Sequence, residues 1–213
     1  MRELIIGVVS SLIATGLTVT AGWFGLSWPR KLLLRLSSRV SGLGVVRAYK
    51  KQSAANNDLA ADLRSARWIK ALVGRGNELT RDSFQDVWRQ RHTRLRSVHI
   101  LLPDPADPGG WLRSREEEMR PVDPGFEPGL LAKQVSANVD YLSAVISANP
   151  KVEMRLFDAP HTCRAIITDR FAYFTPYLTG THGRNSPCFV FGNGSVMYDH
   201  LLRTFENLWG AGR

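Results

Sequence analysis

The sequence predicts an α/β domain, with a mixed sheet covered by helices, preceded by one N-terminal transmembrane helix. The first observation behind this prediction is an uncharged run from Leu4 to Trp28, which is long enough to cross a bilayer. The second is the order of the periodic segments, in which strand and helix patterns alternate before several strands follow one another directly. We therefore divide the chain into an anchor (1–28), a basic segment with a linker (29–58) and a folded domain (59–213).

The uncharged run is the predicted membrane anchor. As a helix it would measure about 37 Å, against a hydrocarbon core of roughly 30 Å. Trp23 and Trp28 lie near its C-terminal end, where aromatic rings favour the interface. The basic residues that follow directly place the N-terminus outside and residues 30–213 in the cytoplasm, at the inner (plasma) membrane. A signal peptide with a cleavage site at Val19-Thr20-Ala21 is the alternative, but the strongest basic cluster lies downstream of the run.

Small residues recur four apart along the anchor. They form two rows, Gly7, Ser11 and Thr15 in one and Ser10, Ala14, Thr18 and Gly22 in the next. Such rows let two helix backbones approach closely and predict a homodimer, although the same residues are common in any membrane helix.

Positive charge is concentrated directly after the anchor. The segment between Pro29 and Asn57 has no acid and seven basic residues: Arg30, Lys31, Arg35, Arg39, Arg47, Lys50 and Lys51. Because residues 52–213 hold 20 basic and 18 acidic residues, this strip indicates contact with anionic lipid, and a nucleic-acid partner has no support. We expect a surface-lying helix over 30–51, broken at Gly42 and Gly44, and a linker over 48–58.

The folded domain is predicted from its apolar spacing. The expected elements are a strand at 68–73, a helix from Thr80, a strand at 98–102, helices at 111–119 and 130–148, strands at 152–157, 163–168, 171–177 and 188–191, and a C-terminal helix holding Tyr198 to Trp209. The charged residues of 111–119, Arg113, Arg115 and Glu116–Glu118, are expected to form an exposed, salt-bridged surface.

The segment 160–178 carries the candidate chemistry, because a basic and an acidic residue, Arg164 and Asp169, are placed around a predicted hairpin. This segment resembles the His-x-Lys-x4-Asp signature of the phospholipase D superfamily. Arg164 falls on the lysine and Asp169 on the aspartate, whereas Thr162 stands at the histidine position and His161 lies one residue early. The resemblance covers roughly residues 64–210 and one module, as in the single-motif members that form an active site by dimerising.

The resemblance implies a phosphodiester chemistry in which one histidine attacks phosphorus and the partner module's histidine protonates the leaving oxygen. Arginine can clamp a phosphate through its planar fork, so Arg164 is the expected phosphate ligand. His161 is the nucleophile, with Asp169 orienting a histidine, only if a bulge turns His161 to the face of Arg164. Pro176-Tyr177 replaces the family's Gly-Ser, so the expected motif is degenerate.

Three further residues are candidate phosphate contacts. Arg75 lies between Gly74 and Gly76 after the first strand, where glycines let backbone N–H groups approach an anion. His182 and Arg184 lie in a loop after the strand that ends near residue 177. The alternatives are an ordinary turn and a solvated loop. Cys163 and Cys188 fit no metal spacing and no disulfide framework, and we expect no metal and no cofactor.

Together, the anchor and the resemblance predict a membrane-tethered phospholipase D-like domain that binds a phosphate-bearing ligand without turning it over. Its role would be that of a sensor or effector, for instance in bacterial stress or phage defence, by analogy. One alternative is a dimeric phosphodiesterase, a nuclease or a phospholipase, that uses His161. Another is a membrane scaffold that recruits a protein partner.

Overall fold

The computed structural model describes residues 41–80, 82–88, 94–160 and 162–213. Over these residues the strands are β1 (Val45–Tyr49), β2 (Trp68–Leu72), β3 (Ser97–Pro103), β4 (Val152–Phe157), β5 (Cys163–Thr168), β6 (Phe171–Pro176) and β7 (Cys188–Gly192). The helices are α3 (Asn56–Leu63), α4 (Gln85–Trp88), α5 (Trp111–Met119), α6 (Leu130–Ala148) and α7 (Val196–Ala211), with 3-10 turns η1 (Gln52–Ala55), η2 (Asp82–Phe84) and η3 (Gly183–Asn185).

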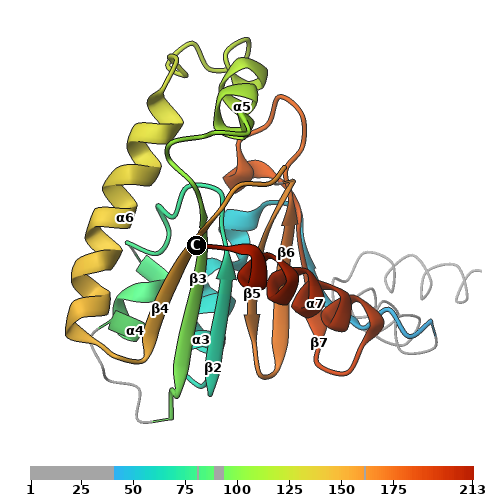
Figure 1. Cartoon of the computed structure of the whole chain (residues 1–213). Coiled ribbons are helices and arrows are strands. Elements are labelled where there is room, and N and C mark those ends of the chain that lie inside the picture. Colours follow the sequence, from blue (N-terminus) through green and yellow to red (C-terminus); the bar gives the residue numbers. More distant parts are fainter. Residues whose placement is uncertain (1–40, 81, 89–93, 161) are drawn as a thin grey trace, which may run out of the picture.

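The described strands form one mixed sheet in the order β1-β7-β6-β5-β2-β3-β4 (Figure 1). Strands β2, β3 and β4 run parallel, whereas β5 is antiparallel to β2 and continues antiparallel through β6 and β7 to β1. As a result, the chain leaving β2, the beginning of β5 and the end of β6 meet at one end of the sheet. We call this end, marked by Gly74, Arg164 and Tyr177, the upper edge; α5 lies above it (Figure 1).

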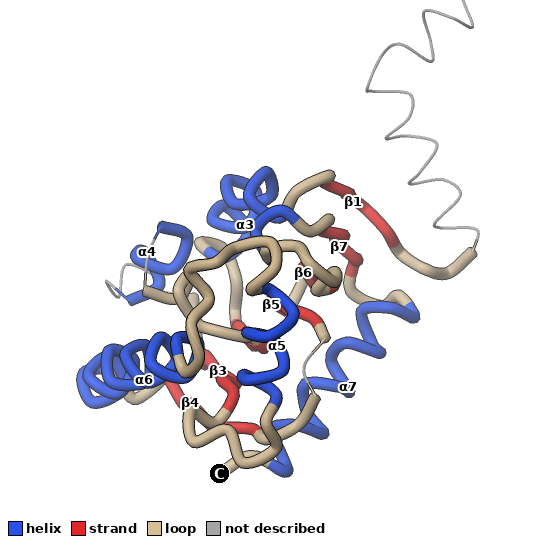
Figure 2. The backbone as a smooth tube through the Cα atoms, turned by 90° about the horizontal axis from the view of Figure 1, so that it is seen from above, coloured by secondary structure: helices blue, strands red, loops and turns tan. Residues whose placement is uncertain are grey.

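Each face of the sheet has its own apolar core. Helices α3, α4 and α6 cover one face and α7 covers the other, as Figure 2 shows from above. Leu63, Phe84 and Leu142 pack on the first face, and Phe205 of α7 packs on the second; all four side chains are fully buried. Burial on both sides explains why β5 reads as a nearly continuous apolar run.

The predicted fold class, an α/β domain with a mixed sheet covered by helices, is confirmed. Helices α5 and α6 and strands β4 and β5 begin and end at the predicted residues. Within the described residues, the segment where the sequence predicts a helix from Thr80 begins with the turn η2 and continues as α4; residues 89–93 lie outside the described residues. The predicted anchor (4–28) lies outside the described residues, and none of the helices that the structure does describe has the length and apolar character needed to cross a membrane.

The linker predicted over 48–58 is wrong, because this segment belongs to the folded domain. Strand β1 pairs with β7 as a sheet edge, and η1 and α3 follow it directly. The surface helix expected to reach Lys51 therefore cannot extend past Gly44, since Val45–Tyr49 is a strand.

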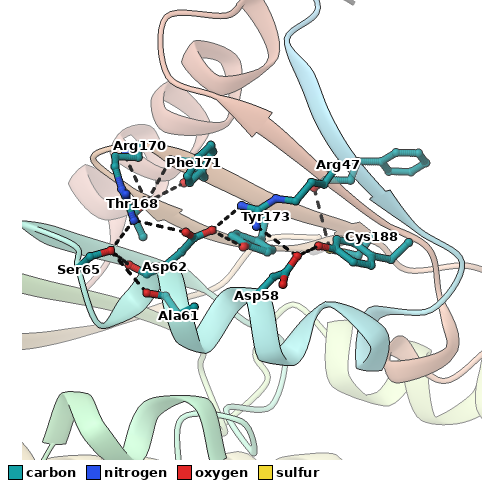
Figure 3. A network of polar contacts seen from close by, with 12 residues as sticks. Arg47, Asp58, Ala61, Asp62, Ser65, Thr168, Arg170, Phe171, Tyr173 and Cys188 are labelled. Atoms are coloured by element: carbon teal, nitrogen blue, oxygen red, sulfur yellow. Dashed lines mark hydrogen bonds and ion pairs between the residues drawn. The ribbon is translucent and has the colours of Figure 1, made fainter. Parts of the chain in front are cut away.

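A polar network holds β1 and α3 to the sheet (Figure 3). Asp62 of α3 accepts hydrogen bonds from Arg47 Nη2 at 2.5 Å, from the Tyr173 hydroxyl at 2.5 Å and from Arg170 Nη2 at 3.3 Å. Asp58 accepts from Arg47 Nη1 at 3.2 Å and from the Tyr49 hydroxyl. Arg47 is thus an internal ion-pair partner and not part of a lipid-facing strip.

The same network raises the pKa values of Tyr173 and Arg47 above their usual values. Burial, followed by the hydrogen bond to Asp62, raises the pKa of Tyr173. For Arg47, burial lowers the pKa, but the hydrogen bond and the negative charge of Asp62 outweigh it, so the pKa lies above its usual value. Both groups are therefore locked in their ordinary protonation states at neutral pH.

Candidate functional site

A cavity of about 380 Å³ opens at the upper edge of the sheet. Its wall comes from η1 and the start of α3, the turn after β2, helix α5, the start of α6, strand β5 and the loop after β6. Among the described residues that line it, one is acidic, Glu78, and four are arginines: Arg75, Arg115, Arg164 and Arg184. This excess of guanidinium groups suits an anion and not a metal cation.

The turn after β2 places Arg75 on the cavity wall. Gly74 passes so close to Tyr177 that a Cβ at this position would lie 2.9 Å from the Tyr177 hydroxyl oxygen, and Gly76 has φ +82. Both positions therefore require glycine. Asn138 of α6 secures the turn by donating to the carbonyl of Arg75 and to Asn77 Oδ1, both at 2.7 Å.

Arg164 lies at the floor of the cavity, on the second residue of β5. Its side chain is 7% exposed, and its Nε lies 2.5 Å from Glu78 Oε2. Its Nη2 is buried and has no hydrogen-bond partner among the described residues. A buried donor without a partner carries a desolvation cost that a bound acceptor removes. The Arg164 guanidinium is therefore ion-paired with Glu78 through Nε, while its buried Nη2 still lacks an acceptor.

Gln52 completes the floor. It is 5% exposed, and its amide donates to Glu78 Oε1 and, at 3.2 Å, to Asn56 Oδ1. Its backbone N–H donates to the carbonyl of Ser186 at 2.7 Å. The carboxylate that faces Arg164 is thus held by a segment far from β5 in the sequence.

Helix α5 covers the cavity because Glu116 ties it to the next helix. The Glu116 carboxylate is 2% exposed and accepts the backbone N–H groups of Gly129 at 2.8 Å and Leu131 at 2.6 Å, at the N-terminus of α6. Arg115 then points toward the loop after β6, where its Nη2 donates to the carbonyl of Thr181 at 2.7 Å. The expected exposed, salt-bridged surface of α5 is confirmed for Arg113 and Glu117, which are exposed, and for the Arg115–Glu118 salt bridge. It is wrong for Glu116, a buried helix cap, and for Arg115, which lines the cavity.

His182 faces the cavity from the loop after β6. Its Nε2 lies 3.2 Å from Asp123 Oδ2, and its ring is tilted against Phe126 with centroids 5.6 Å apart. Arg75 lies over the same Phe126 ring, with its guanidinium carbon 5.8 Å from the ring centroid. Phe126 therefore contacts both the histidine and Arg75, and both remain on the cavity wall.

Tyr177 links the two halves of the site. Its hydroxyl accepts the backbone N–H of Gly74 at 3.1 Å, and its ring lies 5.7 Å from the guanidinium carbon of Arg115. Burial raises the pKa of Tyr177 to about 12, so the phenol is neutral at physiological pH. A neutral phenol leaves the positive charge of the surrounding guanidinium groups undiminished.

The structure brings together the four predicted ligand residues, since Arg164, Arg75, His182 and Arg184 all line the cavity. It does not bring Asp169 to them. Asp169 lies in the β5–β6 turn at the opposite end of β5, where its Oδ1 accepts the backbone N–H of Arg67 at 2.8 Å. At about 3.3 Å per residue, Asp169 is roughly 16 Å from Arg164 along the strand.

The histidine position of the motif is described only in part. His161 lies outside the described residues. Thr162 is exposed, and its carbonyl accepts the backbone N–H of Tyr177 at 2.8 Å, which continues the β5–β6 pairing beyond the strand ends.

Sequence reasoning missed Glu78, Gln52, Arg115 and Tyr177 as site residues. Glu78 carried a usable signal, because it follows the Gly74-Arg75-Gly76 turn by two residues. Gln52 carried none, since its role depends on β1 joining the far edge of the sheet.

No protein-family model matches the sequence, and no curated protein matches it. Among solved structures, TrmBL2, an archaeal chromatin protein with a novel mode of DNA binding, is 14% identical with a TM-score of 0.47 and covers 99% of this chain and 68% of its own. Nuc of Salmonella typhimurium, a phospholipase D family member, is 12% identical with a TM-score of 0.42, and the match covers 75% of this chain and 89% of Nuc. NucT of Helicobacter pylori is 11% identical with a TM-score of 0.45, and the match covers 76% of this chain and 91% of NucT. At these identities and TM-scores, no residue role is transferred to this chain.

Proposed function

We propose that this chain is a membrane-anchored phospholipase D-like domain that holds a phosphate-bearing ligand in the upper-edge cavity without turning it over. The observation that carries the proposal is Arg164, which lines the cavity and whose buried Nη2 has no hydrogen-bond partner among the described residues. A phosphate oxygen is the acceptor that the planar guanidinium fork prefers. Three other candidate phosphate contacts, Arg75, His182 and Arg184, line the same cavity.

The absence of turnover is proposed from the motif itself. Thr162 occupies the position of the nucleophilic histidine, and a threonine hydroxyl needs an adjacent base to attack phosphorus. Asp169, which would orient a histidine, is held in the hairpin turn at the other end of β5. Both features favour ligand retention over catalysis.

The proposal includes a place in the cell. The uncharged run 4–28 would anchor the chain in the inner membrane with its N-terminus outside, and the small-residue rows of this run would pair two copies. Ligand binding in the cytoplasmic domain would then change how the anchored chains associate, which is the role of a sensor or effector. Protease protection in inside-out membrane vesicles tests the orientation: digestion of residues 41–213 is expected, and full protection would exclude it.

The binding claim is tested with the full-length chain in detergent micelles by isothermal titration with inorganic phosphate. Arg164→Gln should abolish the heat of binding, because it removes the charge and the unpaired donor. Arg67→Gln is the matched control, since Arg67 is 70% exposed and pairs with Asp169 at the opposite end of β5. Undetectable binding of phosphate by the unmodified protein, or equal binding by Arg164→Gln, would refute the proposal.

Turnover is tested separately with bis-nitrophenyl phosphate. We expect no release of nitrophenol by the unmodified protein. A measurable rate that His161→Ala removes would replace the proposed binder by the dimeric phosphodiesterase.

A further inference from the structure

The basic side chains on the cavity wall differ in whether they lie beside a carboxylate. Arg164 Nε is 2.5 Å from Glu78, Arg115 Nη1 is 2.5 Å from Glu118, and His182 Nε2 is 3.2 Å from Asp123. Arg75 and Arg184 have no ion pair with any described residue. Arg75 Nη1 instead donates to the neutral amide of Gln134 at 3.2 Å. Two guanidinium charges therefore face the cavity without a compensating carboxylate.

The environment of Arg75 makes its charge costly. Burial lowers the pKa of Arg75, and the positive charges of Arg115 and Arg184 lower it further, against the opposite influence of Tyr177 and Asp123. Because Arg115 and Arg184 act on Arg75 in the same direction, the three guanidinium groups repel one another across this part of the wall. A bound anion relieves both the desolvation and the repulsion.

The charge of the anion distinguishes two kinds of phosphate ligand. A bridging phosphodiester carries one negative charge, whereas a terminal phosphomonoester carries about −1.5 to −2 at pH 7, because its second pKa is about 6. Two unpaired guanidinium groups match the second kind. Resting on the proposed function, we infer that the cavity selects a terminal phosphomonoester, bound as the dianion by Arg75 and Arg184, over a phosphodiester.

The cavity also holds more than a phosphate group. At about 380 Å³ it lies within the range of sites for small organic ligands. Apolar side chains also line it, among them Trp111, Met119 and Leu131. The organic part of a phosphomonoester lies against these side chains while its phosphate faces the arginines.

The test compares two ligands that differ in one methyl group, phenyl phosphate and methyl phenyl phosphate, by isothermal titration of the full-length chain in micelles. At pH 7.5 we expect the monoester to bind about tenfold more tightly. At pH 5 the monoester has lost most of its second charge, so the ratio of affinities should fall toward one. Glu78, Glu118, Asp123 and His182 can also change charge between these pH values. Where such a change alters the affinity of both ligands by the same factor, it cancels in the ratio of the two affinities.

Two variants assign the preference to its residues. Arg75→Gln and Arg184→Gln should each reduce the monoester-to-diester ratio several-fold, whereas Arg113→Gln, an exposed residue of α5 outside the cavity wall, should leave it unchanged. Because Arg184 is exposed, its variant keeps the test valid even if Arg75→Gln fails to fold.

The outcomes separate this inference from the proposed function. Binding of neither ligand refutes both. Equal binding of the two esters at pH 7.5 refutes the preference for a dianion and leaves phosphate binding intact. A ratio that Arg75→Gln and Arg184→Gln both leave unchanged also refutes the inference. Comparison of glycerol 3-phosphate with dihexanoyl phosphatidic acid identifies the source of the dianion: equal affinity assigns a soluble ester, and tighter binding of the lipid assigns a headgroup.

Discussion

Arg164 Nε lies 2.5 Å from Glu78 Oε2, so the guanidinium at the floor of the cavity already holds one carboxylate. Arg164 lies near the start of β5, and Glu78 lies in the turn after β2. A ligand phosphate would therefore compete with Glu78 for the same guanidinium group. This competition sets the first prediction.

Glu78→Gln should strengthen phosphate binding several-fold and lower the stability of the ligand-free protein. The substitution removes a negative charge beside the ligand and leaves Arg164 without its ion-pair partner, at a cost on the order of 1–2 kcal/mol, because the Glu78 side chain is one-third exposed. Urea denaturation with and without phosphate measures both effects. Glu117→Gln, an exposed residue of α5, is the control. Weaker phosphate binding by Glu78→Gln would contradict the competition.

Asp62→Asn should destabilise the fold by about 2–3 kcal/mol, because Arg47 and Arg170 lose a carboxylate that is only 12% exposed. Asp86→Asn is the matched control. Its partner Arg64 lies 3.8 Å away and both side chains are largely exposed, so a loss below about 1 kcal/mol is expected. Urea denaturation of the two variants at neutral pH makes the comparison, and equal losses would show that the network in Figure 3 adds nothing to stability.

His99 should make the fold less stable in mild acid. Its ring stacks on Trp209, with centroids 4.6 Å apart, and burial followed by the charge of Lys70 lowers its pKa. A lowered folded-state pKa means that the unfolded chain binds the proton first, so stability present above about pH 6.5 is lost as the pH falls through the folded pKa.

Thermal denaturation between pH 7.5 and pH 5 measures this effect. His99→Gln should lose less stability over that window than the unmodified protein, whereas His200→Gln, at an exposed position, should behave like the unmodified protein. An unchanged pH profile in His99→Gln would rule out this titration.

Gly76→Ala should weaken both the fold and phosphate binding. Its φ of +82 strains an L-residue by about 1–2 kcal/mol, and the new Cβ would lie 3.0 Å from Leu102 Cδ2. Displacement of the turn would move Arg75 from the cavity wall. Gly110→Ala has the same backbone strain at φ +72 but meets no atom within 4 Å, so it isolates the strain from the contact. Binding that survives Gly76→Ala unchanged would show that the turn does not position Arg75.

Much of the domain could be predicted from local pattern. Leu130–Ala148 repeats its apolar residues at helical spacing, Val152–Phe157 alternates apolar with charged residues, and Cys163–Thr168 is a short, mostly apolar run. Their bounds therefore follow from the sequence alone. The positions of cavity side chains that lie next to the end of a predicted strand could also be predicted. Arg75 lies three residues after β2 and Arg164 is the second residue of β5, and the order of strands brings the two to one edge.

The segment 45–63 could not be predicted, because its structure depends on partners far along the chain. Val45–Tyr49 is too short to be recognised as a strand until β7 pairs with it, and Arg47 appears as a surface charge until Asp62 and Tyr173 surround it. Asp169 failed for the opposite reason. Its spacing from Arg164 matched a motif, but the four intervening residues are an extended strand that carries the two side chains to opposite ends of the sheet.

The sequence by itself determined the α/β class, most helix and strand bounds, and four basic residues of the candidate site, because apolar periodicity and strand ends are local properties of the chain. Only the tertiary structure decided which of those charges are neutralised. Glu78, Glu118 and Asp123 each meet a cavity residue through folding, and Arg75 and Arg184 do not. Ion pairs form between side chains that the fold brings within a few ångströms, so the charge left for a ligand is a property of the folded molecule.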